Sequence, residues 1–256
     1  MGLFPVSVSV SHRGVDVEER EAQLLKAAMK IIRDEGGTCV SVAVPLESAR
    51  AISRYEAMDF VKQTSSSIVT FEGTPMILTK EEKKMFPTGT FSEGEVSGVD
   101  VLQYGGRMLG EVAEYEARET LSRGAPRPLL LAGLAGVPGN VARVAYEGGQ
   151  IVGFGVARRA SFDAAAAVEN SWILGPLYAA RLGVAVKLLD SLLMELGKGP
   201  KLRIFVPEAN TAGINMAEVL GLTEKGRVGV MVMGGVEKGE VLQHAKIFGV
   251  ASLELG

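Results

Sequence analysis

Residues 172–196, WILGPLYAARLGVAVKLLDSLLMEL, decide the fold. The stretch begins as a short apolar run, turns through small residues and continues as an amphipathic helix. Apolar residues then recur at three- and four-residue spacing on one helical face: Ala185, Leu188, Leu189, Leu192, Leu193 and Leu196. A strand, a small-residue turn and a helix in this order aim the unpaired N–H groups of the first helical turn at an anion. Glycine at position 183 lets a diphosphate approach the backbone closely, so we interpret this turn as a cofactor site.

The composition is that of a globular protein and lacks the features of nucleic-acid-binding, disulfide-bonded, secreted and membrane-spanning proteins. The 256 residues are 47% hydrophobic and 22% charged, with a net charge of −3, which supports a sizeable core and gives no support to nucleic-acid binding. A single cysteine, Cys39, excludes an internal disulfide and a multi-cysteine zinc site, and we expect no metal. We find neither a secretory signal nor an apolar run of the roughly 18 residues that a membrane span needs. We therefore expect a cytoplasmic protein without a membrane partner.

The rest of the chain alternates between strand and helix patterns. We expect a helix that follows the charged segment 16–21 and runs to about Asp34, and a helical region from Val101 to about Arg123. Residues 74–99 have no periodicity and read as a linker. The other expected elements are strands at 4–10, 38–44, 66–71, 201–206, 228–233 and 247–255, a hairpin at 141–157, and helices at 48–58 and 211–220.

Residues 43–73 align with residues 205–235 at a constant offset that needs no gap. Both segments have the order strand, proline, helix, strand; Val44-Pro45 meets Val206-Pro207, and Gly73 meets Gly235. Shared order favours an internal duplication. The alternative is that any two α/β units look alike at this level of identity.

Three motifs carry a resemblance to a known family: Gly175-Pro176-Leu177-Tyr178, the turn Arg181-Leu182-Gly183-Val184-Ala185, and the stretch from Val206-Pro207-Glu208-Ala209-Asn210 to Glu218-Val219-Leu220-Gly221-Leu222. With them the chain resembles the GCN5-related N-acetyltransferase (GNAT) family, and in particular the C-terminal domain of tandem GNAT proteins of the YitH type. That subgroup is also suggested by Asp100, Gly106-Arg107, and Ile247-Phe248-Gly249 before the closing Glu254-Leu255-Gly256.

The resemblance implies an α/β fold with a mixed sheet, namely one full GNAT domain preceded by a partial first copy. It covers residues 98–256 well, and residues 1–73 only as the back half of a first domain. We therefore expect a partial, degenerate half-domain at 1–73, a linker at 74–97 and a GNAT domain at 98–256.

The resemblance also implies acetyl-CoA, or another acyl-CoA, as co-substrate in a cleft between the fourth and fifth strands. Pro176 and Pro207 fall near the ends of the two strands in question, and since proline cannot donate to a ladder, we expect the strands to part there. The expected cofactor-binding residues are the backbone of Leu177 and Tyr178, the turn residues Arg181, Leu182, Gly183, Val184 and Ala185, and the side chain of Asn210.

The turn and the expected catalytic acid depart from the family pattern. Ala180 stands where the family carries Gln or Arg, and Arg181 comes one residue late, so an ordinary surface helix after a small-residue turn is the alternative reading. The position of the family's catalytic tyrosine is occupied by Ala217. Tyr178 is the nearest substitute as acid and Glu169 a candidate base, against the plainer roles of a packed aromatic residue and a surface carboxylate.

The first half departs further from a cofactor site. Its small-residue positions carry Glu19 and Glu21, and carboxylates facing a diphosphate add like-charge repulsion. We therefore expect this half to be a non-binding partner that completes the architecture.

Three functions from different classes compete. The leading hypothesis is an acyl-CoA-dependent N-acyltransferase whose acceptor, a small-molecule or protein amine, attacks the thioester directly. The second is a non-catalytic acyl-CoA-binding or scaffold protein with a degenerate GNAT fold. The third is a subunit whose exposed sheet edge pairs with another chain; a homodimer is compatible with all three.

Overall fold

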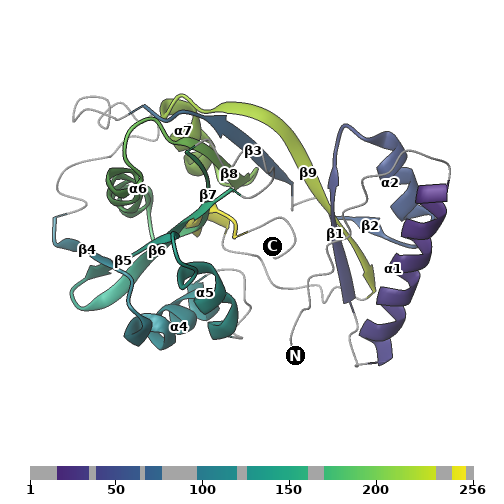
Figure 1. Ribbon diagram of the computed structural model, residues 1–256, viewed down its shortest axis with the longest axis horizontal. Helices are drawn as coiled ribbons and strands as arrows, with labels where there is room; N and C mark the ends of the chain where they lie inside the picture. The colour runs from purple at the N-terminus through teal and green to yellow at the C-terminus, as the bar shows by residue number, and fades with distance from the viewer. Residues whose placement is uncertain are drawn as a thin grey trace.

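The computed structural model describes residues 16–34, 39–63, 67–76, 97–119, 126–160, 170–234 and 244–251. Within them, ten strands form one mixed sheet in the order β1-β9-β3-β8-β7-β6-β5-β4, with β2 beside β9 and β10 beside β7 (Figure 1). The strands are β1 (Cys39–Pro45), β2 (Val61–Lys62), β3 (Ile68–Gly73), β4 (Val99–Gln103), β5 (Val141–Glu147), β6 (Gln150–Arg159), β7 (Ser171–Ala179), β8 (Lys201–Pro207), β9 (Thr223–Gly234) and β10 (Ile247–Gly249). Among these described strands, only β7 and β8 pair in parallel, and the other pairs are antiparallel.

Helices cover both faces of the sheet (Figure 1). The α-helices are α1 (Asp16–Asp34), α2 (Ala49–Glu56), α4 (Leu109–Glu119), α5 (Pro128–Ala135), α6 (Leu182–Leu196) and α7 (Thr211–Val219), with 3-10 turns η2 (Gly106–Met108) and η4 (His244–Lys246). Helices α6 and α7 pack on one face of the β5–β8 region, and α4 and α5 on the other. Helices α1 and α2 lie at the far end, over β1 and the end of β9.

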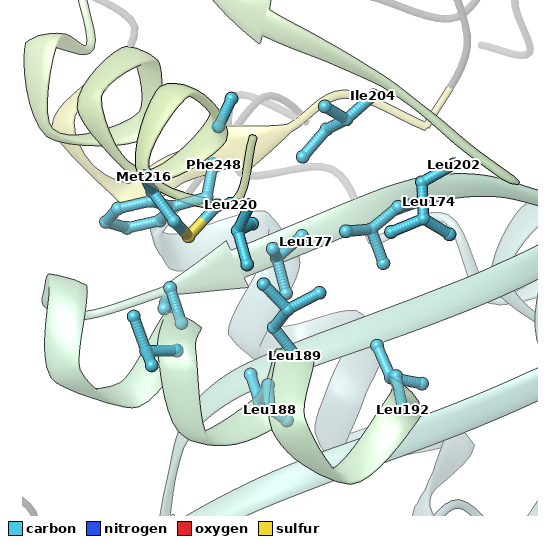
Figure 2. Close-up of a cluster of buried hydrophobic side chains, with 14 of the residues drawn as sticks. Leu174, Leu177, Leu188, Leu189, Leu192, Leu202, Ile204, Met216, Leu220 and Phe248 are labelled. Carbon is cyan, nitrogen blue, oxygen red and sulfur yellow. The ribbon is translucent and has the colours of Figure 1, made fainter. Parts of the chain in front are cut away.

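Helix α6 supplies the centre of the largest apolar cluster. Leu188, Leu189 and Leu192 are at most 1% exposed and face the sheet, as the spacing of apolar residues predicts (Figure 2). Leu188 and Leu192 lie over Gly153 and Gly155 of β6. At roughly 1.5–3 kcal/mol for each fully buried side chain of this size, the stripe fixes α6 firmly against the sheet. The start of α6 is therefore held directly after the end of β7.

Strand β3 joins the two ends of the molecule into one sheet. It pairs antiparallel with β8 from Ile68–Pro207 to Gly73–Leu202, and on its other edge with the first half of β9. The second half of β9 runs on to pair with β1 and β2. A strand from the first 73 residues thus lies inside the sheet of the segment that follows the linker.

Local sequence patterns predicted many of these elements correctly. The hairpin at 141–157 is confirmed as β5 and β6, whose turn places Gly148 and Gly149 at φ of 56° and 79°, a left-handed pair that suits a two-residue hairpin loop. The expected helix from Val101 is wrong at its start, because residues 99–103 form β4 beside β5 and the helix begins only at Leu109.

Some expectations fall outside the described residues. The strand expected at 4–10 lies there, as does most of the expected linker, whose residues 77–96 are not described. Among the helices that the structure describes, we find none that is both long and apolar enough to cross a membrane.

Candidate functional site

Strands β7 and β8 run side by side for only half of their length. Their parallel pairing ends at Leu174–Ile204, directly before Gly175-Pro176, and β8 ends at Pro207. The expectation that the strands part near their ends is confirmed, because the pairing stops one residue before Gly175-Pro176 and three residues before Pro207. Pro176 has no N–H to give to a ladder. The gap opens toward the end of β7 that leads into α6.

The first turn of α6 has the geometry of an anion site. Arg181 is its N-cap residue, in an extended conformation, and no side chain among the described residues caps the helix. Val184 and Ala185 donate their N–H groups to the Arg181 oxygen at 3.1 and 3.2 Å, and Gly183 is buried beside them. A helix start without a side-chain cap keeps backbone donors and the positive end of the helix dipole available to an anion.

The Arg181 side chain is engaged by a carboxylate at the end of β5. Its Nη1 and Nη2 donate to the two carboxylate oxygens of Glu147 at 3.0 and 2.6 Å. The guanidinium lowers the pKa of Glu147 below its usual value. A phosphate bound by Arg181 would therefore compete with Glu147 for the same donors.

Strand β10 lies in the gap between β7 and β8. It pairs antiparallel with β7, with Ile247 beside Tyr178 and Gly249 beside Leu177. On its other edge the residue after Gly249 donates its N–H to the Phe205 oxygen of β8 at 2.9 Å. The backbone of Leu177 and Tyr178, expected to pair with a bound pantetheine arm, thus pairs with the chain's own β10.

The middle residue of β10 fills the space between α6 and α7. Phe248 is fully buried, and Figure 2 shows it near Met216 of α7, Leu220 directly after α7 and Leu177 of β7. The remaining predicted cofactor residue is 2% exposed: the Asn210 side chain accepts from the N–H of Gly213, which caps α7, and donates to the Ile247 oxygen at 2.8 Å. Its amide therefore ties α7 to β10.

Tyr178 points away from α6, because neighbouring side chains on a strand face opposite sides of the sheet. It is fully buried in the cluster beneath α4 and α5, and its hydroxyl forms no well-aligned hydrogen bond with the described residues. Burial raises the pKa of Tyr178, and the nearby Glu116 carboxylate raises it further. The tyrosine expected at the mouth of the cleft lies inside the core instead.

Three charged residues surround this tyrosine: Glu116 and Arg127, which the sequence did not single out, and Arg158, which had a solvated charge as its default role and a contact to an acidic acceptor or to CoA phosphates as the alternative. The guanidinium of Arg127 forms a buried ion pair with Glu116, with Nη2 2.5 Å from Oε1, and both groups act electrostatically on the Tyr178 hydroxyl. Arg158 donates from Nε to the Gly175 oxygen at 3.1 Å and from Nη2 to the Ala251 oxygen. Glu116 could have been found from the sequence, because it lies one helical turn after Val112 on the apolar face of α4, where a carboxylate needs a partner.

The candidate base Glu169 lies outside the described residues, so its role stays a prediction. Within the part of the chain that the structure describes, no three His, Cys, Asp or Glu side chains gather as a metal site would require. The structure thus brings together the α6 turn, β7, β10 and Asn210, and separates Tyr178 from them by the sheet.

Acidification should loosen the segment that carries β10. His244 precedes β10, its Nδ1 is buried, and burial lowers the pKa of its imidazole. The undocked segment would bind a proton more readily, so lowering the pH through the ordinary histidine pKa of about 6.5 shifts the balance toward undocking. We expect smaller hydrogen-exchange protection factors for Ile247–Val250 at pH 5.5 than at pH 8, and no such difference in His244→Asn. Equal protection factors in the unchanged chain at the two pH values would contradict this. The neighbouring Glu119 carboxylate does not account for such a difference, because its hydrogen bond from Lys246 lowers its pKa below the ordinary glutamate value.

Comparison with known proteins assigns the family. A family model described as an acetyltransferase (GNAT) domain matches residues 119–249, about half of the chain. A comparison with curated proteins found no match.

Three solved structures with similar folds share only a small part of their sequence with this chain. A candidate acetyltransferase from Pyrococcus horikoshii superposes with a TM-score of 0.60 at 17% identity, covering 91% of this chain and 65% of its own. A tandem GNAT protein from the clavulanic acid biosynthesis pathway gives 0.54 at 15% identity, with 85% and 70% covered. A GCN5-related N-acetyltransferase from Sphaerobacter thermophilus gives 0.53 at 16% identity, with 84% and 67% covered. The chain thus spans about two thirds of the length of these relatives. The expected mixed α/β GNAT fold is confirmed, and the chain belongs to the GNAT acetyltransferase domain family.

Proposed function

We propose that the chain is an acyl-CoA-dependent N-acyltransferase, with acetyl-CoA as the first co-substrate to test. The observation that carries the proposal is the junction of β7 and α6: the pairing of β7 with β8 ends at Leu174–Ile204, and β7 then leads into a helix start without a side-chain cap. A gap one strand wide beside an anion-binding helix end suits an extended arm that ends in a diphosphate. Membership of the GNAT family supports the same reading.

In the described fold, the residues of the chain fit the diphosphate of an acyl-CoA but leave no room for its extended arm. The turn from Arg181 to Ala185 fits the diphosphate, through backbone N–H groups and the guanidinium that now pairs with Glu147. The gap between β7 and β8 does not accept the rest of an acyl-CoA while β10 lies in it. Overall, acyl transfer to an amine forms a C–N bond, breaks the thioester C–S bond and moves one proton from the amine to the departing sulfur.

A non-catalytic acyl-CoA-binding or scaffold protein is the second candidate. Ala217, which stands where the family resemblance places a tyrosine acid, is fully buried in the core. Tyr178, the substitute acid, is sealed beneath α4 and α5. Neither residue offers a proton donor on the α6 face of the sheet, and this favours binding over turnover.

We further propose that residues 1–73 are the back half of a first GNAT copy of the tandem, YitH-like type. Two facts support this: β1, α2 and β3 follow the order of β8, α7 and β9, and β3 pairs antiparallel with β8 as β9 does with β1. We also propose that the protein is cytoplasmic, that its acceptor is a small-molecule or protein amine, and that it does not bind nucleic acid.

Replacing Gly183 with Asp should abolish any acetyl-CoA binding. The new carboxylate would stand where the diphosphate approaches the helix, and like charges at short range repel. Isothermal titration calorimetry with acetyl-CoA measures the loss, and thermal melting checks that the variant folds. Leu129→Asp is the matched control, because it adds the same charge at a side chain that is 87% exposed on α5. Undiminished binding by Gly183→Asp would mean that the diphosphate lies elsewhere. An amine-library turnover screen then separates enzyme from binding protein.

A further inference from the structure

Strand β10 closes the gap between β7 and β8 from one edge to the other. Its backbone pairs with β7 at Tyr178 and Leu177 and with β8 at Phe205. The segment's side chains are almost fully buried: Ile247 and Phe248 are 0% exposed, and Val250 and Ala251 are 2% exposed. The gap is therefore occupied by the chain itself.

Two glycines make room for the segment. A β-carbon on Gly175 of β7 would lie 2.1 Å from the Val250 oxygen, a distance that real β-carbons do not show. A β-carbon on Gly249 of β10 would lie 3.2 Å from the Leu174 oxygen and 3.3 Å from the Ile204 side chain. The backbones of β7 and β10 thus approach each other at a place where neither strand carries a side chain, which is a close and specific fit.

Polar side chains hold the segment at both of its ends. Asn210 donates to the Ile247 oxygen at 2.8 Å, and Arg158 donates to the oxygens of Gly175 and Ala251. Both side chains donate hydrogen bonds to backbone carbonyl groups. An extended ligand with amide groups offers the same kind of acceptor, so β10 uses contacts that such a ligand would need.

We propose that β10 and acyl-CoA compete for this one gap, so that the full chain takes up acyl-CoA only when the segment 247–251 leaves it. This inference rests on the proposed function. The two occupants exclude each other: β10 uses the free backbone edge of Leu177 and Tyr178, and Phe248 fills the space between α6 and α7. The described fold is then the closed state, and the C-terminal strand acts as an autoinhibitory ligand of its own domain.

Weakening β10 tests the competition. We would measure acetyl-CoA binding by calorimetry for the full chain, for Gly249→Val, and for a chain that ends at Lys246. The valine methyl groups would meet the Leu174 oxygen and the Ile204 side chain, which pushes β10 out without altering the α6 turn. Both altered chains should bind at least tenfold more tightly than the full chain. Val44→Ala is the matched control, because it removes buried apolar volume in β1, which pairs with β9 and not with β10, and it should leave the affinity unchanged.

A second measurement uses the unaltered chain, so that the test survives if a variant fails to fold. Hydrogen exchange of Ile247–Val250 should accelerate when acetyl-CoA is added, while exchange in α6 should slow. A synthetic peptide of residues 244–256, added to the chain that ends at Lys246, should weaken its acetyl-CoA binding.

The outcomes separate the inference from the function on which it rests. Equal affinity in the full and altered chains, with β10 still protected when acetyl-CoA is bound, would overturn the competition and leave acyl-CoA binding intact. An absence of binding in every chain, up to millimolar acetyl-CoA, would overturn the proposed function and the competition with it.

Discussion

Residues 98–256 expressed without the preceding chain should be insoluble or unfolded, although they include the whole segment matched by the GNAT family model. The reason is β3, which lies inside the sheet between β8 and β9 and comes from residues 68–73. Its loss would remove Ile68, Val69 and Phe71, each at most 5% exposed, from the core. At roughly 1.5–3 kcal/mol for each side chain, the lost burial is comparable with the whole stability of a domain, about 5–15 kcal/mol.

The same deletion would also expose two unpaired strand edges. The edge of β8 from Leu202 to Pro207 and the edge of β9 from Thr223 to Val228 would lose their partner. Open edges of this kind pair with other chains and lead to aggregation. Solubility, size-exclusion chromatography and circular dichroism measure the effect, and co-expression with residues 1–76 is the control that should restore a soluble complex. A soluble, monomeric fragment with a cooperative melting transition would show that β3 is dispensable.

Arg127→Ala should be the most damaging point substitution among the polar residues beneath the sheet. Glu116 is only 1% exposed and Arg127 22% exposed, so the substitution leaves a buried carboxylate without its ion-pair partner. Breaking a buried pair from one side costs about 3–5 kcal/mol of unfolding free energy, whereas replacing both partners by groups of similar volume is often nearly neutral. Urea unfolding at neutral pH measures the difference.

The double variant Glu116→Gln, Arg127→Met is the matched control. It keeps the volume of both side chains and removes both charges, so we expect it to be more stable than Arg127→Ala. A loss below about 1 kcal/mol for Arg127→Ala would mean that water or another group satisfies the Glu116 carboxylate, since surface pairs typically contribute no more than that.

Local patterns sufficed for the part of the site that is local in sequence. The spacing of leucines places the buried face of α6, and Pro176 marks where β7 and β8 part. These features depend on residues within a few positions of one another, since each belongs to a single helix or to the end of a single strand. The region from Val99 to Gln103 shows the limit. Its three apolar residues are too few to tell a strand period from a helix period, and the pairing of this segment with β5 decides the outcome.

The contents of the site could not be predicted in the same way. The apolar run from Ile247 reads as a strand, but nothing near it in sequence indicates that it inserts between β7 and β8. Tyr178 was expected at the mouth of the cleft, yet strand alternation turns it to the opposite face from Leu177, against Glu116 and Arg127. Such placements depend on which segments pair across the fold, and this is not encoded in local periodicity.

A crystal structure of the full chain grown with acetyl-CoA is the most direct test of the central claim, that the β7–α6 junction is an acyl-CoA site. We expect the diphosphate against the backbone N–H groups of Leu182 and Gly183, Arg181 turned from Glu147 toward a phosphate, and β10 absent from the gap beside Leu177. Acetyl-CoA bound elsewhere, with β10 still paired to β7, would contradict the claim.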